Sequence, residues 1–150
     1  MKTPTIALVL GLANLGCRPP PGGGAALPDA VRTYTEGVRW ERFEVAAVVI
    51  PPAERAQFLE ERDTLAEDLR ITDAEIVHLR ERGRTGDVAV KLAWYSEREG
   101  TVHTTVAHQR WERQGRAWRL VDEVRGRGEP MPGLREPTDG REPLARAGQD

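Results

Sequence analysis

Hydrophobic residues follow a helical spacing in the first half of the chain and an alternating spacing in the second. In the first half, Val31, Tyr34 and Val38 begin an apolar stripe that continues to Ile50, and Asp29 is a candidate helix cap. This pattern predicts helices from about residue 29 to residue 50.

Glycine and proline are expected to divide these helices. Gly37 can separate the stripe into two helices, and Pro51 ends it, because the residue before a proline disfavours the α conformation. Pro52 suits the first position of a further helix. On that helix one face is acidic and the other carries Phe58, Leu59, Leu65, Ala66 and Leu69.

From Ile71 onward the period changes to two, which is typical of strands. Val88, Val90, Leu92 and Trp94 give the clearest alternation. Turn signals at 83–86, 98–100 and 114–115 separate four strands joined by short turns, which predicts an antiparallel meander. The predicted strands cover about residues 74–82, 87–97, 101–113 and 116–124.

The register of the meander follows from closing its three turns. The expected flanking pairs are Arg82–Asp87, Arg98–Thr101 and Arg113–Arg116. This register also places Trp111 opposite Trp118. One face of the sheet then collects Val77, Leu79, Val88, Val90, Leu92, Trp94, Ala107, Trp111, Trp118 and Leu120. We expect the helices to cover this face.

The amino terminus has the pattern of an export signal. A basic start at Lys2 precedes an apolar stretch of 12 residues with one Asn, Thr5–Gly16, which is too short for the ~20 residues that a membrane-spanning helix needs. The stretch ends at Cys17, the only cysteine of the chain, and a Pro/Gly-rich run follows. An ordinary signal peptide followed by an incidental cysteine is the alternative reading.

This arrangement resembles the lipobox of bacterial lipoproteins, although Asn14 stands where that family usually has Leu. The resemblance implies acyl chains on Cys17, and hence a membrane as a partner. It also implies location in the cell envelope, facing the periplasm or the cell surface. Arg18 rather than Asp after the cysteine favours the outer membrane by the same resemblance.

The chain is therefore expected to have one folded domain and two flanking segments. Residues 1–16 read as a signal peptide, 17–28 as a lipidated cysteine with a flexible tether, 29–125 as an α+β domain and 126–150 as a disordered tail. Helices followed by a long-stranded meander resemble the cystatin/NTF2-like cone-shaped domains. The segment that runs from residues 40–43 through residues 71–73 also resembles a group of uncharacterised bacterial lipoproteins. Neither resemblance implies one activity.

Composition argues against several classes of function. The 24 acidic and 22 basic residues nearly cancel, whereas nucleic-acid binding normally needs a concentrated basic surface. One cysteine allows no intrachain disulfide and no zinc-finger site, and the spacing of the histidines suits no common metal ion. We therefore expect no cofactor and no metal.

Two groups of residues are candidates for function. The first is a possible pocket inside the cone, formed by His103, Thr105, Gln109 and Asp122, which interrupt the apolar face as Glu75 also does. The second is a basic set on the outer face of the sheet, where Arg110 is expected opposite Arg119. Its members are His78, Arg80, Lys91, His108, Arg110 and Arg119.

These groups correspond to two expected functions. The first is a non-catalytic, lipid-anchored envelope module that binds a protein partner, or a second copy of itself, through the outer face. The alternative is a small-molecule binder or NTF2-like enzyme that uses the interior, where burial can raise the pKa of an Asp toward that of a general base.

Overall fold

Helices form the first layer of the domain in the computed structural model, which describes residues 24–138. They are α1 (Leu27–Arg39), α2 (Phe43–Ala47), a 3-10 turn (Pro52–Glu54) and α3 (Arg55–Leu65). Pro52 begins the 3-10 turn, as predicted. The expected cap Asp29 instead lies in the first turn of α1, and Ala26 occupies the cap position.

Gly37 lies inside α1 and does not divide it, contrary to the prediction. The break comes at residues 40–42, where Glu41 has a positive φ of 55°. A Cβ on Gly37 would lie 2.8 Å from the backbone nitrogen of Ala46. The glycine therefore permits α1 and α2 to pack closely.

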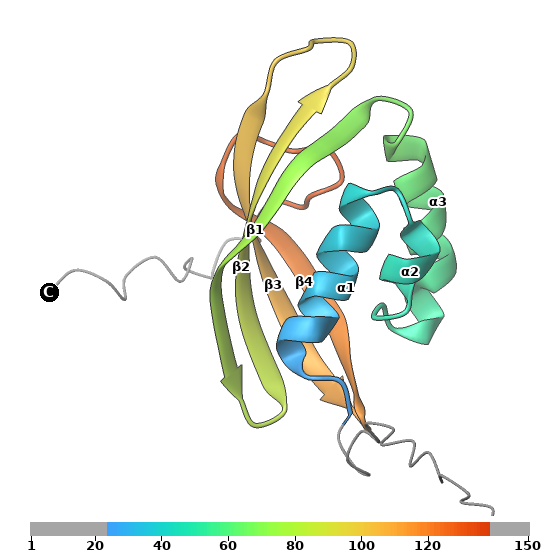
Figure 1. Ribbon diagram of the computed structural model, residues 1–150, viewed down its shortest axis with the longest axis vertical. Helices are drawn as coiled ribbons and strands as arrows, with labels where there is room; N and C mark the ends of the chain where they lie inside the picture. Colours follow the sequence, from blue (N-terminus) through green and yellow to red (C-terminus); the bar gives the residue numbers. More distant parts are fainter. Residues whose placement is uncertain (1–23, 139–150) are drawn as a thin grey trace, which may run out of the picture.

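The second layer is a four-stranded antiparallel sheet in the order β1-β2-β3-β4, which confirms the predicted meander. All the helices lie on one side of this twisted sheet (Figure 1), giving the α+β class expected from the sequence. The strands are β1 (Leu69–Arg82), β2 (Thr85–Ser96), β3 (His103–Gln114) and β4 (Ala117–Gly128).

The predicted register was wrong by two residues at each turn. The observed flanking pairs are Arg82–Thr85, Trp94–His103 and Gln114–Ala117. Trp111 consequently lies opposite Leu120. Because side chains alternate with a period of two, this error moved no residue to the other face.

β-Bulges did change which face some residues occupy. In β1 the register shifts between Ile76 and His78, and Val77 is 44% exposed although it was expected in the core. Glu75, also expected on the inner face, lies opposite Lys91 on the outer face. A second shift in β1 lies between Ile71 and Asp73.

The bulge in β4 matters most for the site. It falls opposite the step from Arg110 to Trp111, so that Asp122 pairs with Arg110 on the outer face. Glu123 then takes the inner position opposite Gln109. The expectation that Asp122 lies inside the cone was therefore wrong, because one extra residue reverses the alternation of side chains beyond it.

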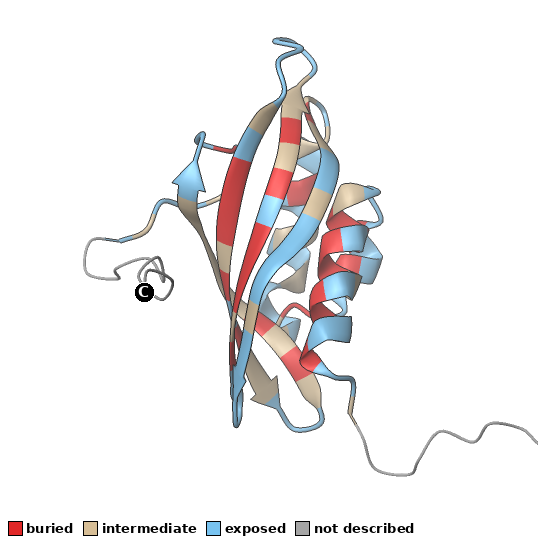
Figure 2. Ribbon diagram, turned by 60° about the vertical axis from the view of Figure 1, so that its left-hand side comes forward, coloured by how far each residue is buried: buried red, intermediate tan, exposed pale blue. Residues whose placement is uncertain are grey.

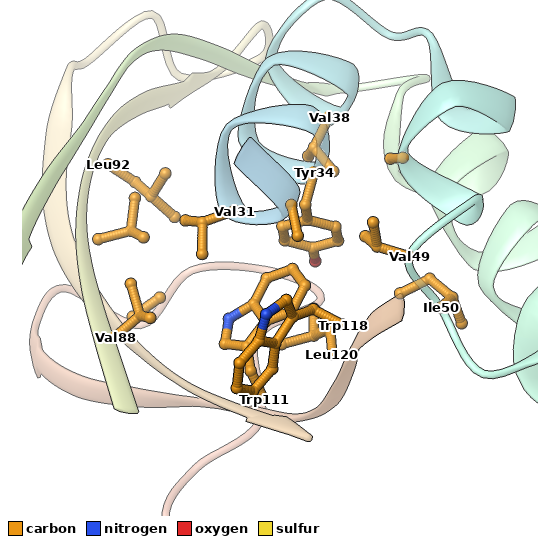
Figure 3. Close-up of a cluster of buried hydrophobic side chains, with 14 of the residues drawn as sticks. Val31, Tyr34, Val38, Val49, Ile50, Val88, Leu92, Trp111, Trp118 and Leu120 are labelled. Atoms are coloured by element: carbon orange, nitrogen blue, oxygen red, sulfur yellow. The ribbon is translucent and has the colours of Figure 1, made fainter. Parts of the chain in front are cut away.

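The hydrophobic core fills the space between α1 and the inner face of the sheet. Buried positions are concentrated on the central strands β2 and β3 and on the sheet-facing side of α1 (Figure 2). Trp111 and Trp118 are its largest fully buried side chains, and Tyr34 of α1 meets Trp111 edge-on (Figure 3). The helix 27–39 thus closes the concave face of the sheet.

The folded domain extends past residue 125, where we expected a disordered tail. β4 continues to Gly128, and residues 129–138, here named the strap, fold back on the domain. Met131 of the strap is 5% exposed within the core, and the Thr105 hydroxyl donates to the Glu129 carbonyl at 2.6 Å. The prediction failed because a Gly/Pro-rich composition gives no sign that its one methionine, Met131, is buried in the core. Residues 139–150 lie outside the described part of the chain.

The two edges of the sheet differ. The N–H of Leu120 donates to the Val49 carbonyl at 2.9 Å, and the N–H of Arg125 donates to the Arg135 carbonyl at 2.7 Å. These bonds cover the β4 edge. The outer edge of β1 pairs with no other strand in residues 24–138.

Candidate functional site

A buried polar contact joins three elements of the domain. Tyr34 of α1 donates its hydroxyl hydrogen to Oε2 of Glu123 in β4 at 2.6 Å. Nη2 of Arg62 in α3 donates to the Tyr34 hydroxyl at 2.9 Å and lies 3.5 Å from Glu123 Oε2. The side chains of Arg62 and Glu123 are 10% and 13% exposed, so this is a largely buried ion pair.

The contact continues into the core through an amide. Gln109 Nε2 donates to Glu123 Oε1 at 2.8 Å, and the indole N–H of Trp111 donates to Gln109 Oε1 at 3.1 Å. Both carboxylate oxygens of Glu123 therefore accept hydrogen bonds from fixed donors. A buried charge needs hydrogen bonds of this kind to compensate for the water that it loses on burial.

Burial sets the protonation states of this group. Burial raises the pKa of the Tyr34 hydroxyl far above its usual value, so the phenol stays neutral and acts as a donor. Burial alone would lower the pKa of Arg62, but the neighbouring Tyr34 and Glu123 groups raise it overall. The guanidinium remains charged, and neither group is suited to exchange protons near neutral pH.

A groove of about 610 Å³ lies over this contact, between α3, β4 and the strap. Arg62 and Tyr34 are part of its wall, and Phe58 lies beneath the Arg62 guanidinium at 5.4 Å from the ring centre. The lining residues are Tyr34, Ile50, Glu54, Gln57, Phe58, Glu61, Arg62, Leu120, Val121, Asp122, Glu123, Gly133, Leu134 and Arg135.

The groove is acidic overall. It contains four carboxylates and two guanidinium groups; Arg62 pairs with Glu123, and Arg135 bonds to Asp122. Neither Glu54 nor Glu61 forms an ion pair within residues 24–138, although Gln57 donates to Glu61 at 2.7 Å. The negative charge that has no ion-pair partner among these residues therefore lies on the groove wall formed by the 3-10 turn and α3.

The interior of the cone has little free space. The cavity beside Gln109 and Glu123 has a volume of about 20 Å³, which is room for about one water molecule. The side chains of Leu92, Met131 and Leu134 occupy the rest of this region. This cavity is far too small for a small-molecule substrate.

Of the four predicted pocket residues, only Gln109 hydrogen-bonds to the buried group formed by Tyr34, Arg62 and Glu123. Thr105 is buried and links Trp94, whose indole donates to its hydroxyl at 2.9 Å, to the strap. The His103 ring stacks on Trp94, with ring centres 4.7 Å apart. Asp122 lies on the outer face and bonds to Arg135. The structure does not bring these four residues together.

Two members of the predicted basic set on the outer face form ion pairs with carboxylates. Lys91 pairs with Glu75 at 3.1 Å and Arg110 with Glu112 at 2.7 Å. The expected Arg110–Arg119 juxtaposition is wrong: Asp122 lies opposite Arg110, and the Arg119 guanidinium bonds to the Val48 carbonyl.

The histidines of this set do lie on one face. His78 and His108 flank Ala89 across the sheet, and Arg80 is opposite Asp87. Among the described residues no three His, Cys, Asp or Glu side chains gather closely enough to hold a metal ion. Cys17 lies outside these residues.

Sequence reasoning missed Arg62 and Glu123 and treated Tyr34 only as a core residue. A signal existed for Arg62, which is four residues after Phe58 and three before Leu65 and therefore shares their apolar helix face. It is the one buried residue of α3. No comparable signal marks Glu123, whose direction depends on the β4 bulge.

These features define an α+β domain with helices on one face of an antiparallel meander and an acidic groove at its β4 edge. No helix in the described part of the chain has the length and hydropathy to cross a membrane. The sequence matches no known protein family and no curated protein.

Among solved structures, the chain is similar to a SEC-C motif-containing protein from Rhodopseudomonas palustris. The TM-score is 0.58, with 13% identity, over 68% of this chain and 80% of that chain. It is also similar to a de novo designed β-sheet protein, with a TM-score of 0.49 and 20% identity over 67% and 88% of the two chains. The first similarity concerns the fold alone.

Proposed function

We propose that this chain is an exported lipoprotein, anchored through acyl chains on Cys17, whose domain is a non-catalytic binding module of the cell envelope. The short apolar leader that ends at the only cysteine supports the anchor. Helices followed by a concave meander support placing the domain among the cystatin/NTF2-like folds.

The proposal of a binding module rests on the difference in volume between the interior cavity beside Gln109 and the groove at the β4 edge. The interior holds about 20 Å³, whereas the groove holds about 610 Å³ and falls in the range of known ligand sites. A binding site at the groove therefore agrees better with the geometry than catalysis inside the cone.

The chemistry of the groove indicates a cationic partner. Glu54 and Glu61 supply negative charge on one wall, while Phe58, Leu120 and Leu134 supply apolar contact. A lysine- or arginine-bearing segment of another envelope protein satisfies both requirements. The outer face of the sheet is a weaker candidate, because Lys91 and Arg110 already have carboxylate partners.

Photo-crosslinking in the native envelope tests the groove. A crosslinking amino acid at Gln57, which lines the groove, should give a discrete adduct, and one at Glu60, exposed on the same helix outside the lining, should not. The adduct should be lost in Glu54→Lys/Glu61→Lys and retained in Glu60→Lys/Asp63→Lys. Equal adducts at positions 57 and 60 would contradict a binding role for the groove.

A further inference from the structure

The folded domain begins beside two hairpin turns. A Cβ on Gly24 would collide with the Arg116 carbonyl, and one on Gly86 would collide with the Leu27 side chain. The start of α1 therefore lies at the same end of the sheet as the β1–β2 and β3–β4 turns (Figure 1). The β2–β3 loop, residues 97–102, is at the opposite end.

Four arginines surround these turns: Arg82, Arg84, Arg113 and Arg116, here named the tether-end arginines. Arg82, Arg84 and Arg116 are exposed and Arg113 is half-buried. The Arg113 N–H donates to the Arg84 carbonyl at 2.8 Å, and Arg84 Nη2 donates to the Arg113 carbonyl at 2.9 Å. These two bonds fix the β1–β2 turn against β3.

The charge at this end is not balanced by the protein. Residues 80–87 and 110–119 contain seven arginines against three carboxylates, a net charge of +4. Within residues 24–138 none of the tether-end arginines forms an ion pair. Neighbouring like charges are unfavourable unless an anion lies between them. The surface therefore lacks an anionic counterpart.

The tether brings one anionic surface within reach. Seven peptide bonds separate Cys17 from Gly24, and a chain of that length spans at most about 25 Å. If Cys17 carries acyl chains, the end of the domain that bears the arginines lies within that distance of the lipid headgroups. The opposite end is farther away.

We propose that the tether-end arginines dock on the phosphates of anionic lipids and hold the domain upright on the membrane, with the β2–β3 loop pointing away. This inference rests on the lipid anchor of the proposed function. Arginine suits the role because its planar guanidinium bonds to phosphate in a bidentate way.

The orientation can be measured on the mature chain. The Cys17 thiol is coupled to a maleimide lipid, and a fluorescent amino acid is placed at Gln114 or at Glu99, near the two ends of the sheet. Energy transfer to a headgroup acceptor is compared on phosphatidylcholine vesicles with and without phosphatidylglycerol. Anionic lipid should raise transfer from position 114 and lower it from position 99, and added salt should remove the difference.

Charge-matched variants identify the contact. Arg82→Gln/Arg116→Gln should weaken the docked orientation by about fivefold for each arginine removed, and Arg70→Gln/Arg98→Gln, which removes the same charge beside the β2–β3 loop, should leave it unchanged. Circular dichroism confirms folding of each variant.

Equal transfer on neutral and anionic vesicles would overturn the docking proposal, as would equal losses in the two double variants. The natural anchor is tested separately by mass spectrometry of the protein isolated from cells, where an unmodified Cys17 would show that it is not acylated. The vesicle experiment does not depend on that result, because the maleimide coupling replaces acylation.

Discussion

Glu123 illustrates how a single carboxylate can hold a helical layer to a sheet. It bonds to Tyr34 of α1 and lies beside Arg62 of α3, so one residue of β4 connects two helices. A buried pair of this kind contributes modestly compared with apolar packing, but removal of one partner leaves the other charge without compensation.

Replacement of this carboxylate should therefore be costly. We expect Glu123→Leu to lower the free energy of unfolding by about 3–5 kcal/mol, because the Arg62 charge then stays buried alone. Arg62→Leu/Glu123→Leu should recover part of that loss. Urea denaturation monitored by circular dichroism measures both. A double variant less stable than the single one would show that the ion pair is not the source of the effect.

His108 should make the domain less stable in acid. Burial lowers its pKa from the ordinary 6.5, and Arg127 and His78 lower it further. As pH falls through about 6.5 toward the folded-state value, the unfolded chain takes up the proton first, so the free energy of unfolding decreases.

The comparison with His108→Gln isolates this contribution. Between about pH 8 and about pH 5, the stability of the wild type should fall more than that of the variant. Denaturant titrations at the two pH values give the difference. Parallel losses in the two proteins would assign the acid sensitivity to other groups.

At the scale of elements, alternation determined most of the sheet from sequence. The register errors of two residues at the turns did not change the predicted faces of the sheet, because Leu79, Val90 and Trp118 stayed on the inner face. Bulges could not be predicted, since the extra residue depends on how twisted strands meet the helices. That is why Val77 and Asp122 were placed on the wrong face.

The strap is expected to contribute to stability. Met131→Ala should lower the free energy of unfolding by about 2–4 kcal/mol, because this side chain lies in the core at 5% exposure. Val102→Ala, at a position 62% exposed, is the control and should change little. Thermal and urea unfolding measure both. A negligible effect of Met131→Ala would mean that the strap does not close the core in solution.

At the scale of the molecule, the architecture could be predicted and the groove could not. The meander and its helical cover follow from spacing along the chain. The groove forms where α3, β4 and the strap meet, and no local pattern encodes the meeting of Arg62 with Glu123. Sites of this kind depend on tertiary contacts between distant segments.

The proposed anchor makes a prediction for the whole protein. Cells fed an alkyne fatty acid should label the wild type and not Cys17→Ala, and the variant should move from the membrane fraction to the soluble fraction. Two or more acyl chains give stable attachment, whereas one gives only marginal binding. A labelled Cys17→Ala protein would place the acyl group elsewhere.

An anchored protein diffuses in two dimensions, where copies meet far more often than in bulk solution, so an open strand edge becomes a hazard for polymerisation. The β4 edge is covered by Val49 and Arg135, and the β1 edge carries extra residues at Thr72 and Val77. A strand from a neighbouring copy could match β1 for only a few residues before the ladder lost alignment. If the chain is lipid-anchored as proposed, the irregular edge would allow dense packing on the membrane without growth into fibres.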